Sequence, residues 1–156
     1  MAARDGRVGR PQAVLFACGM NAVRSPMAAA LLRQMLGGSL FVGSAGVRKG
    51  DLDAFAVAAM DEVGIDIRAH RPMTFEELDD LDGLNFDLIV TLSPEAHHKA
   101  LELTRALAAE VEYWPTPDPT AIEGNREQRM SAYRSLREQL LERIRVRFLP
   151  AARGNE

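Results

Sequence analysis

The amino-acid sequence predicts a three-layer α/β/α domain in which helices cover both faces of a four-stranded parallel sheet. Short apolar runs of strand character alternate along the chain with longer segments of helical periodicity, a pattern typical of parallel strands joined by right-handed crossovers. The chain has 156 residues, of which 47% are hydrophobic and 26% charged, which suits one domain with its own core. We expect that domain over residues 12–150, with loose tails at 1–11 and 151–156.

The first strand and the first helix have the clearest signals. Residues 13–17 form a continuous apolar run, as expected for a strand that is buried on both faces. A helix over residues 25–36 follows, with Ser25 at the N-cap, Pro26 at the first helical position and two glycines, Gly37 and Gly38, as the stop.

The next segment predicts a strand over residues 40–44 and a helix over about 52–63 that ends at Gly64. Thr74 and Glu77 have the spacing of a capping box, in which each side chain bonds the other residue's backbone N–H. A short acidic helix is therefore expected after Thr74.

The second half of the chain predicts two more strands, each followed by a helix. The strands span residues 86–92 and 111–114, and the helices span about 93–109 and 123–149. One apolar stripe is expected to bury the last helix; its members are Met130, Tyr133, Leu136, Leu140, Ile144 and Phe148.

Composition excludes several classes of function. Cys18 is the one cysteine, so the chain forms no internal disulfide and no multi-cysteine zinc site, and we expect a cytoplasmic location. The net charge is −3 and the positive residues are dispersed, which argues against a nucleic-acid partner. No apolar run approaches the ~20 residues of a membrane span, and the early apolar stretch is too short for a signal peptide.

The segment that carries chemistry follows the first strand, where ligands bind in parallel sheets. Cys18 and Arg24 are separated by five residues, and Ser25-Pro26 then opens a helix. A short loop entering a helix N-terminus turns backbone N–H groups into one concavity that suits a phosphate-sized dianion. Arg24 would close this cradle with its planar fork, and the same field favours the thiolate of Cys18. The alternative is a buried structural cysteine, which the spacing to Arg24 and the helix start disfavour.

These residues resemble the low-molecular-weight protein tyrosine phosphatases and their thioredoxin-coupled arsenate reductase relatives. The resemblance covers most of the chain, and its strongest segments are residues 14–30, 43–46, 64–70 and 114–119. It implies a four-stranded parallel sheet with helices on both faces, in agreement with the order of the elements.

The resemblance also implies the roles of individual residues. Cys18 would be the nucleophile, Arg24 the clamp on phosphate and transition state, and Asp118 the general acid. Asp118 follows the fourth strand and so would lie at the same sheet edge as Cys18, and Pro119 keeps it out of the helical region. The remaining implied site residues bind phosphate (Gly19, Met20, Asn21, Ala22, Val23 and Ser25) or support the loop by hydrogen bonds (Ser44 and His70). Ser25 would also aid Cys18 as a leaving group. No metal and no cofactor are implied.

The chain departs from the family pattern in several places, among them the loop and the walls of the site. The usual loop reads Cys-x-Gly-Asn, whereas this chain has glycine one place early, at Gly19, and Met20 after it. Aromatic residues that wall the phosphotyrosine ring in eukaryotic-type members are absent, because Thr120 and Ala121 follow Asp-Pro and residues 48–51 are Arg-Lys-Gly-Asp. A deep aromatic slot is therefore not expected.

Three functions fit these residues. The leading one is hydrolysis of a phosphomonoester, from a phosphotyrosine protein or a small aryl phosphate, with inorganic phosphate as product. The second is arsenate reduction with an external thiol, since a chain with one cysteine has no intramolecular thiol relay. The third is a phosphate-binding module without catalysis.

Overall fold

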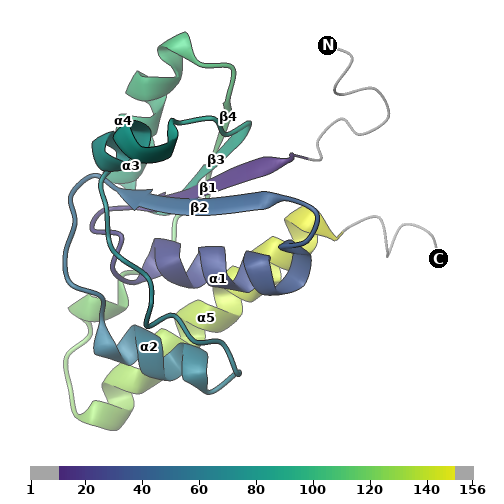
Figure 1. Ribbon diagram of the computed structural model, residues 1–156. Helices are drawn as coiled ribbons and strands as arrows, with labels where there is room; N and C mark the ends of the chain where they lie inside the picture. The colour runs from purple at the N-terminus through teal and green to yellow at the C-terminus, as the bar shows by residue number, and fades with distance from the viewer. Residues whose placement is uncertain (1–10, 150–156) are drawn as a thin grey trace.

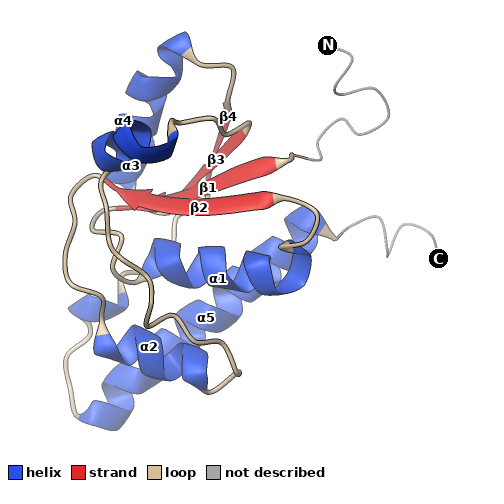
Figure 2. Cartoon of the chain, in the orientation of Figure 1, coloured by secondary structure: helices blue, strands red, loops and turns tan. Residues whose placement is uncertain are grey.

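The computed structural model describes residues 11–149 and confirms the predicted architecture (Figures 1 and 2). The parallel sheet has the order β2-β1-β3-β4, and its strands are β1 (Ala13–Cys18), β2 (Phe41–Gly46), β3 (Leu88–Thr91) and β4 (Glu110–Tyr113). One face is covered by α1 (Arg24–Leu36), α2 (Ala54–Asp61) and α5 (Arg126–Phe148), the other by α3 (Phe75–Asp82) and α4 (Pro94–Leu103). Apart from Pro11, the predicted tails lie outside the described residues.

The central strand β1 divides the core into two clusters. Val14 and Phe16 pack with α1, α2 and α5, whereas Leu15 and Ala17 pack with α3 and α4. All four side chains are fully buried, and each large apolar side chain that is buried contributes about 1.5–3 kcal/mol. Cys18 therefore stands at the end of a strand that is packed on both faces.

The last helix confirms the predicted stripe, because all six of its members are buried on α5. The helix begins at Arg126 rather than near residue 123. Asn125 accepts a hydrogen bond from the Gln128 N–H at 2.8 Å, and the Gln128 side chain accepts one from the Asn125 N–H at 2.8 Å. This reciprocal capping box fixes the start of the helix.

Side-chain caps also set other boundaries. The Thr74–Glu77 capping box is confirmed at the start of α3. Asp53 caps α2 by accepting from two backbone N–H groups, so the helix starts at Ala54. The predicted helix to residue 109 is too long, since α4 ends at Leu103 and a 3₁₀ turn follows (Thr104–Ala106). The Thr104 hydroxyl donates to the Ala100 carbonyl there, which competes with continuation of the helix.

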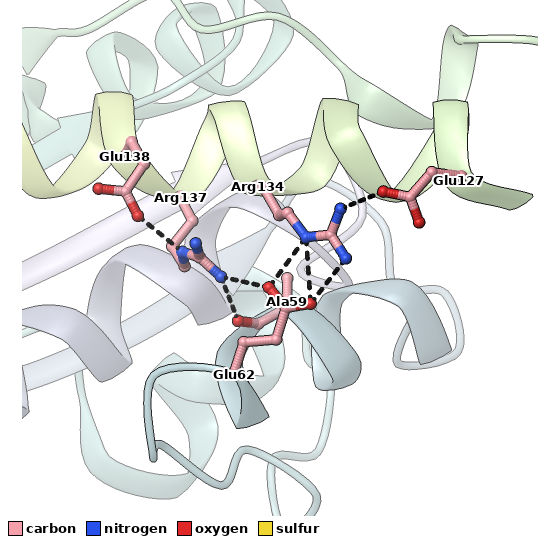
Figure 3. Close-up of polar contacts among 6 residues, drawn as sticks. All are labelled: Ala59, Glu62, Glu127, Arg134, Arg137 and Glu138. Carbon is pink, nitrogen blue, oxygen red and sulfur yellow. Dashed lines mark hydrogen bonds and ion pairs between the residues drawn. The ribbon is translucent and has the colours of Figure 1, made fainter.

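A cluster of charged residues joins α2 to α5 (Figure 3). The Glu62 carboxylate accepts hydrogen bonds from Arg134 at 2.8–3.0 Å and from Arg137 at 2.9 Å, and Arg137 also donates to the Ala59 carbonyl at 2.7 Å. The hydrogen bonds from the two arginines lower the pKa of Glu62 to about 2. Because α2 follows directly from the segment beside the Cys18 loop, this cluster ties that segment to α5.

We predict that Glu62→Gln lowers the unfolding midpoint at pH 7. The pKa of Glu62 falls from its ordinary value of 4.5 to about 2 in the folded protein. Ionised Glu62 therefore contributes its full stabilisation of the fold above pH 4.5, and this stabilisation is lost as the pH falls toward 2. Urea unfolding of wild type and variant at pH 7, 5 and 3 measures the difference, which should narrow with acidity.

Two neighbouring carboxylates provide matched controls. Glu127 contacts Arg134 alone and Glu138 contacts Arg137 alone, so their glutamine variants should change the midpoint less than Glu62→Gln does. If Glu62→Gln lowered the unfolding midpoint equally at all three pH values, ionisation of Glu62 would not be the cause of the loss.

Candidate active site

The loop between β1 and α1 lies at the bottom of a cavity of about 560 Å³ at the carboxyl edge of the sheet. Cys18 ends β1, Arg24 begins α1, and Asp118 precedes a 3₁₀ turn, η3 (Pro119–Ala121). All three residues line this cavity. The structure thus brings together, from segments about a hundred residues apart, the three side chains expected to carry chemistry.

The carbonyl groups of the loop from Cys18 to Ala22 all accept hydrogen bonds. Neighbouring segments supply a donor to each carbonyl: the N–H groups of Val47, Arg48, Gly50 and Asp53 bond the carbonyls of Cys18, Gly19, Met20 and Ala22 at 2.8–3.2 Å. His70 bonds that of Asn21 at 3.0 Å. Within residues 11–149, the N–H groups of residues 19–23 have no protein partner. A row of free N–H groups at a helix N-terminus is an anion site.

Asn21 sets the curvature of the loop. Its φ is +55°, a left-handed conformation that asparagine adopts more readily than most residues. Its fully buried amide donates to Ser25 Oγ at 2.8 Å and to Ser44 Oγ at 3.0 Å, and it accepts from the Met73 N–H at 2.9 Å. Every hydrogen-bonding position of this side chain except one acceptor lone pair is therefore used.

Ser25 contacts the cysteine rather than capping the helix. Helix α1 begins at Arg24 with Val23 at the N-cap position and no side-chain cap, so the prediction of Ser25 as N-cap is wrong. Ser25 Oγ lies 3.0 Å from Cys18 Sγ. Since Asn21 donates to Ser25 Oγ, the Ser25 hydroxyl keeps its own proton to donate to the sulfur. A capping side chain would instead occupy N–H groups that an anion could bind.

Arg24 is anchored to the ends of two other strands. Its Nη1 donates to the carbonyl of Leu92, just beyond β3, at 3.3 Å and to that of Thr116, beyond β4, at 3.0 Å. These bonds use one nitrogen of the guanidinium and leave N–H groups on the other side of the fork for a ligand. The side chain is thereby oriented before any anion binds.

The Asp118 carboxylate is held from one side. Its Oδ1 accepts from the Thr120 N–H at 3.0 Å and from the Thr120 hydroxyl at 2.7 Å. Within the described residues its Oδ2 has no partner. One oxygen therefore fixes the orientation, and the other is available for proton transfer.

His70 and Gly46 support the loop from outside. The Asn21 carbonyl can only accept, so His70 bonds it through a protonated Nε2. Burial lowers the pKa of His70 below its ordinary value, although the bond to Asn21 partly offsets this, and the ring is neutral at pH 7. A Cβ at Gly46 would lie 2.8 Å from the Asn21 nitrogen and 2.4 Å from the Arg48 carbonyl oxygen. Only glycine fits where β2 passes the loop.

Sequence reasoning did not identify Asp53 and Tyr133 as parts of this region. Asp53 donates its N–H to the Ala22 carbonyl, and its carboxylate accepts from the Tyr133 hydroxyl at 2.8 Å. Burial, and next the bond to Asp53, raise the pKa of Tyr133, so the hydroxyl remains a donor. The N-cap position of Asp53 is legible in the sequence, but nothing local links it to a residue 80 positions away.

Two further features bear on the class of protein. Within residues 11–149 no helix is long and apolar enough to cross a membrane. The same residues contain no group of three or more His, Cys, Asp or Glu side chains arranged to hold a metal ion. Activity without metal or cofactor stays a prediction from the sequence.

We predict that Asn21→Ala destabilises the fold by about 3 kcal/mol, because three hydrogen bonds of about 1 kcal/mol each are lost and a left-handed alanine adds strain. Asn21→Gly loses the same bonds without the strain, so it should be about 1 kcal/mol more stable than the alanine variant. Chemical denaturation measures both. Equal stability of the two variants would show that the left-handed backbone at this position carries no cost.

Comparison with known proteins assigns the family. The family model described as low molecular weight phosphotyrosine protein phosphatase matches residues 13–146. An arsenate reductase of Bacillus subtilis (strain 168) is 33% identical over 133 residues, which cover 85% of this chain and 91% of that protein.

Solved structures agree with this match. A tyrosine phosphatase from Erwinia amylovora superposes with a TM-score of 0.70 at 18% identity, over 90% of this chain and 93% of its own. An arsenate reductase in the phosphate-binding state superposes with a TM-score of 0.67 at 25% identity, over 89% of this chain and 98% of its own. A tyrosine phosphatase and an arsenate reductase thus share the fold of this chain. The chain belongs to the low molecular weight phosphotyrosine protein phosphatase family.

Proposed function

We propose that this protein is a cysteine-dependent phosphomonoester hydrolase. The observation that carries the proposal is the cavity in which Cys18, Arg24 and Asp118 meet above a loop with free N–H groups. The loop amides and Arg24 bind the phosphoryl group, and they stabilise the charge that develops on its oxygens during transfer. The N–H groups involved are those of Gly19, Met20, Asn21, Ala22 and Val23, followed by Ser25 in the first turn of the helix.

The first chemical step transfers the phosphoryl group to the enzyme. The Cys18 thiolate attacks phosphorus, an S–P bond forms, and the P–O bond to the leaving group breaks. Asp118 gives its proton to the leaving oxygen. The free Oδ2 of Asp118 suits this task, since Thr120 holds only the other oxygen.

The second step releases phosphate. Water attacks phosphorus, Asp118 takes the proton of that water, and the S–P bond breaks. The sulfur leaves as a thiolate, which the Ser25 hydroxyl stabilises from 3.0 Å. Asn21, Ser44 and His70 support both steps by keeping the loop in shape.

The substrate is a phosphotyrosine protein or a small aryl phosphate, and the product is inorganic phosphate. None of the described residues that line the cavity is aromatic, so a phosphotyrosine ring has no aromatic wall to stack on. A strong preference for phosphotyrosine over other aryl phosphates is therefore not part of the proposal. A cytoplasmic location is part of it, on the ground of the single cysteine.

Arsenate reduction is the second candidate, favoured by the names of the relatives. Arsenate has the shape and charge of phosphate, so the same loop would bind it. The chain has one cysteine, however, and reduction within the protein requires further thiols to release the arsenic adduct as a disulfide. An external thiol would have to supply them. A phosphate-binding module without turnover is the third candidate.

Hydrolysis of phosphate esters with different leaving groups tests the first proposal. We predict that Asp118→Asn slows the first step, measured as the pre-steady-state release of the leaving group, about 100-fold or more for an alkyl phosphate but less than tenfold for p-nitrophenyl phosphate, since only the poor leaving group needs a proton. Asparagine still accepts from Thr120, so the local fold is kept. Equal losses on both substrates would remove Asp118 from the acid role.

The Cys18→Ser variant is the control for this assay. Serine should bind phosphate or vanadate yet lose turnover by several orders of magnitude, because its hydroxyl is not ionised in this field. Turnover at the wild-type rate would overturn the proposal, and binding without turnover by the wild type would favour the module without catalysis.

For arsenate, we predict no steady turnover with thioredoxin alone, because the chain has no second thiol. The arsenate reductase of Bacillus subtilis (strain 168) is measured in the same assay for comparison. A second assay adds a small thiol to this protein. Arsenate turnover under that condition would indicate reduction with an external thiol. Steady arsenate reduction with thioredoxin alone would contradict the assignment as a phosphatase.

A further inference from the structure

An ion pair lies over the first residue of the phosphate-binding loop. Arg48, in the segment after β2, donates to both carboxylate oxygens of Glu95, at the start of α4, with Nη2 3.0 Å from Oε1. Since β2 and β3 flank β1, segments that follow them meet across the end of β1. Both residues line the cavity that holds Cys18.

The loop sequence fits this ion pair. A Cβ at Gly19 would lie 3.3 Å from Glu95 Oε1 and 3.9 Å from Arg48 Nη2, so the pair rests directly on that glycine. The next residue, Met20, packs on Gly50, where a Cβ would be 3.1 Å from its terminal methyl group. The departure from the family pattern at Gly19 and Met20 thus lies where the loop meets this ion pair and Gly50.

Stability does not account for the pair. The side chains of Arg48 and Glu95 are 57% and 45% exposed, and ion pairs this exposed contribute little to folding. The ion pair instead changes the charge of the cavity wall. Bidentate bonding occupies the fork of Arg48 and neutralises its charge.

The other charges of the cavity then decide which substrates it favours. Its lining contains two cations, Arg24 and Arg48, and four carboxylates, Asp51, Asp53, Glu95 and Asp118. Arg24 belongs to the phosphate-binding loop itself. With Arg48 neutralised, no unpaired cation of the described lining remains beyond that loop, whereas Asp51 has no partner among the described residues.

We propose that Glu95 is a specificity-determining residue that masks the charge of Arg48, so that the cavity selects phosphorylated substrates with neutral or basic surroundings and disfavours acidic ones. The inference rests on the proposed function, since it concerns the part of the substrate beyond the phosphoryl group. Without Glu95, the guanidinium of Arg48 would be free to bind a second anion in the cavity wall. Acidic groups next to the phosphate would then be attracted rather than repelled.

Peptide binding to the full chain with Cys18→Ser tests this without turnover. The probes are two phosphotyrosine peptides of equal length, one with lysines and one with glutamates beside the phosphotyrosine, measured by calorimetry. We expect tighter binding of the lysine peptide. Adding Glu95→Gln should raise the affinity for the glutamate peptide about fivefold, and high salt should remove that gain.

Two further variants separate charge masking from a structural effect. Arg48→Gln in the Glu95→Gln background should abolish the gain. Lys49→Gln is the matched control, because Lys49 is adjacent to Arg48 but pairs with Glu77 outside the cavity; it should leave the ratio of the two affinities unchanged.

Three results would overturn the proposal: an unchanged ratio in Glu95→Gln, the same gain with Arg48 replaced, or no binding of either peptide. Wild-type hydrolysis of the peptides is measured in parallel. Absent hydrolysis with the expected charge selectivity would contradict the proposed function and leave the masking role of Glu95 supported.

Discussion

The hydrogen bonding of the loop carbonyls to neighbouring segments is the constraint on which the rest of the site depends. Each carbonyl from Cys18 to Ala22 accepts a hydrogen bond from a neighbouring segment, and this leaves the N–H groups of the loop as the polar backbone atoms available to a ligand. Asn21 makes the arrangement possible, because its left-handed φ of +55° turns the chain and its buried amide fixes the turn from three sides. Asn21 thus fixes the turn in the middle of the segment that carries the free N–H groups.

The carboxyl ends of the parallel strands lie at the edge of the sheet that carries this loop. Ends of all four strands lie at one edge, so a side chain from the loop can bond backbone groups beyond the others: Arg24 reaches the carbonyls of Leu92 and Thr116. Packing fixes the position of the edge, since β1 is buried between two apolar clusters. The chemistry of the site thus rests on contacts that are mostly backbone, and these depend on topology more than on the identity of the surrounding side chains.

Much of the fold and of the candidate site could be predicted from the sequence, and the predictions that failed did so for physical reasons. Local patterns were sufficient for the α5 stripe, for the Thr74 cap and for the presence of Cys18 and Asp118 at one sheet edge. Ser25 was assigned to a cap because sequence patterns describe only local partners, and a contact with Cys18 competed successfully. The Asp53–Tyr133 bond and the Arg48–Glu95 pair join residues 80 and 47 positions apart, and no periodicity reports such contacts.

The most direct measurement of the central claim is detection of a covalent phosphoryl group on Cys18. The Asp118→Asn variant, in which water attack on the intermediate lacks its base, is mixed with p-nitrophenyl phosphate, quenched within the first turnovers and analysed by mass spectrometry. The account predicts a phosphoryl adduct on Cys18 that decays as inorganic phosphate appears and is absent from Cys18→Ser. Steady release of phosphate with no adduct on Cys18 at any time would contradict it.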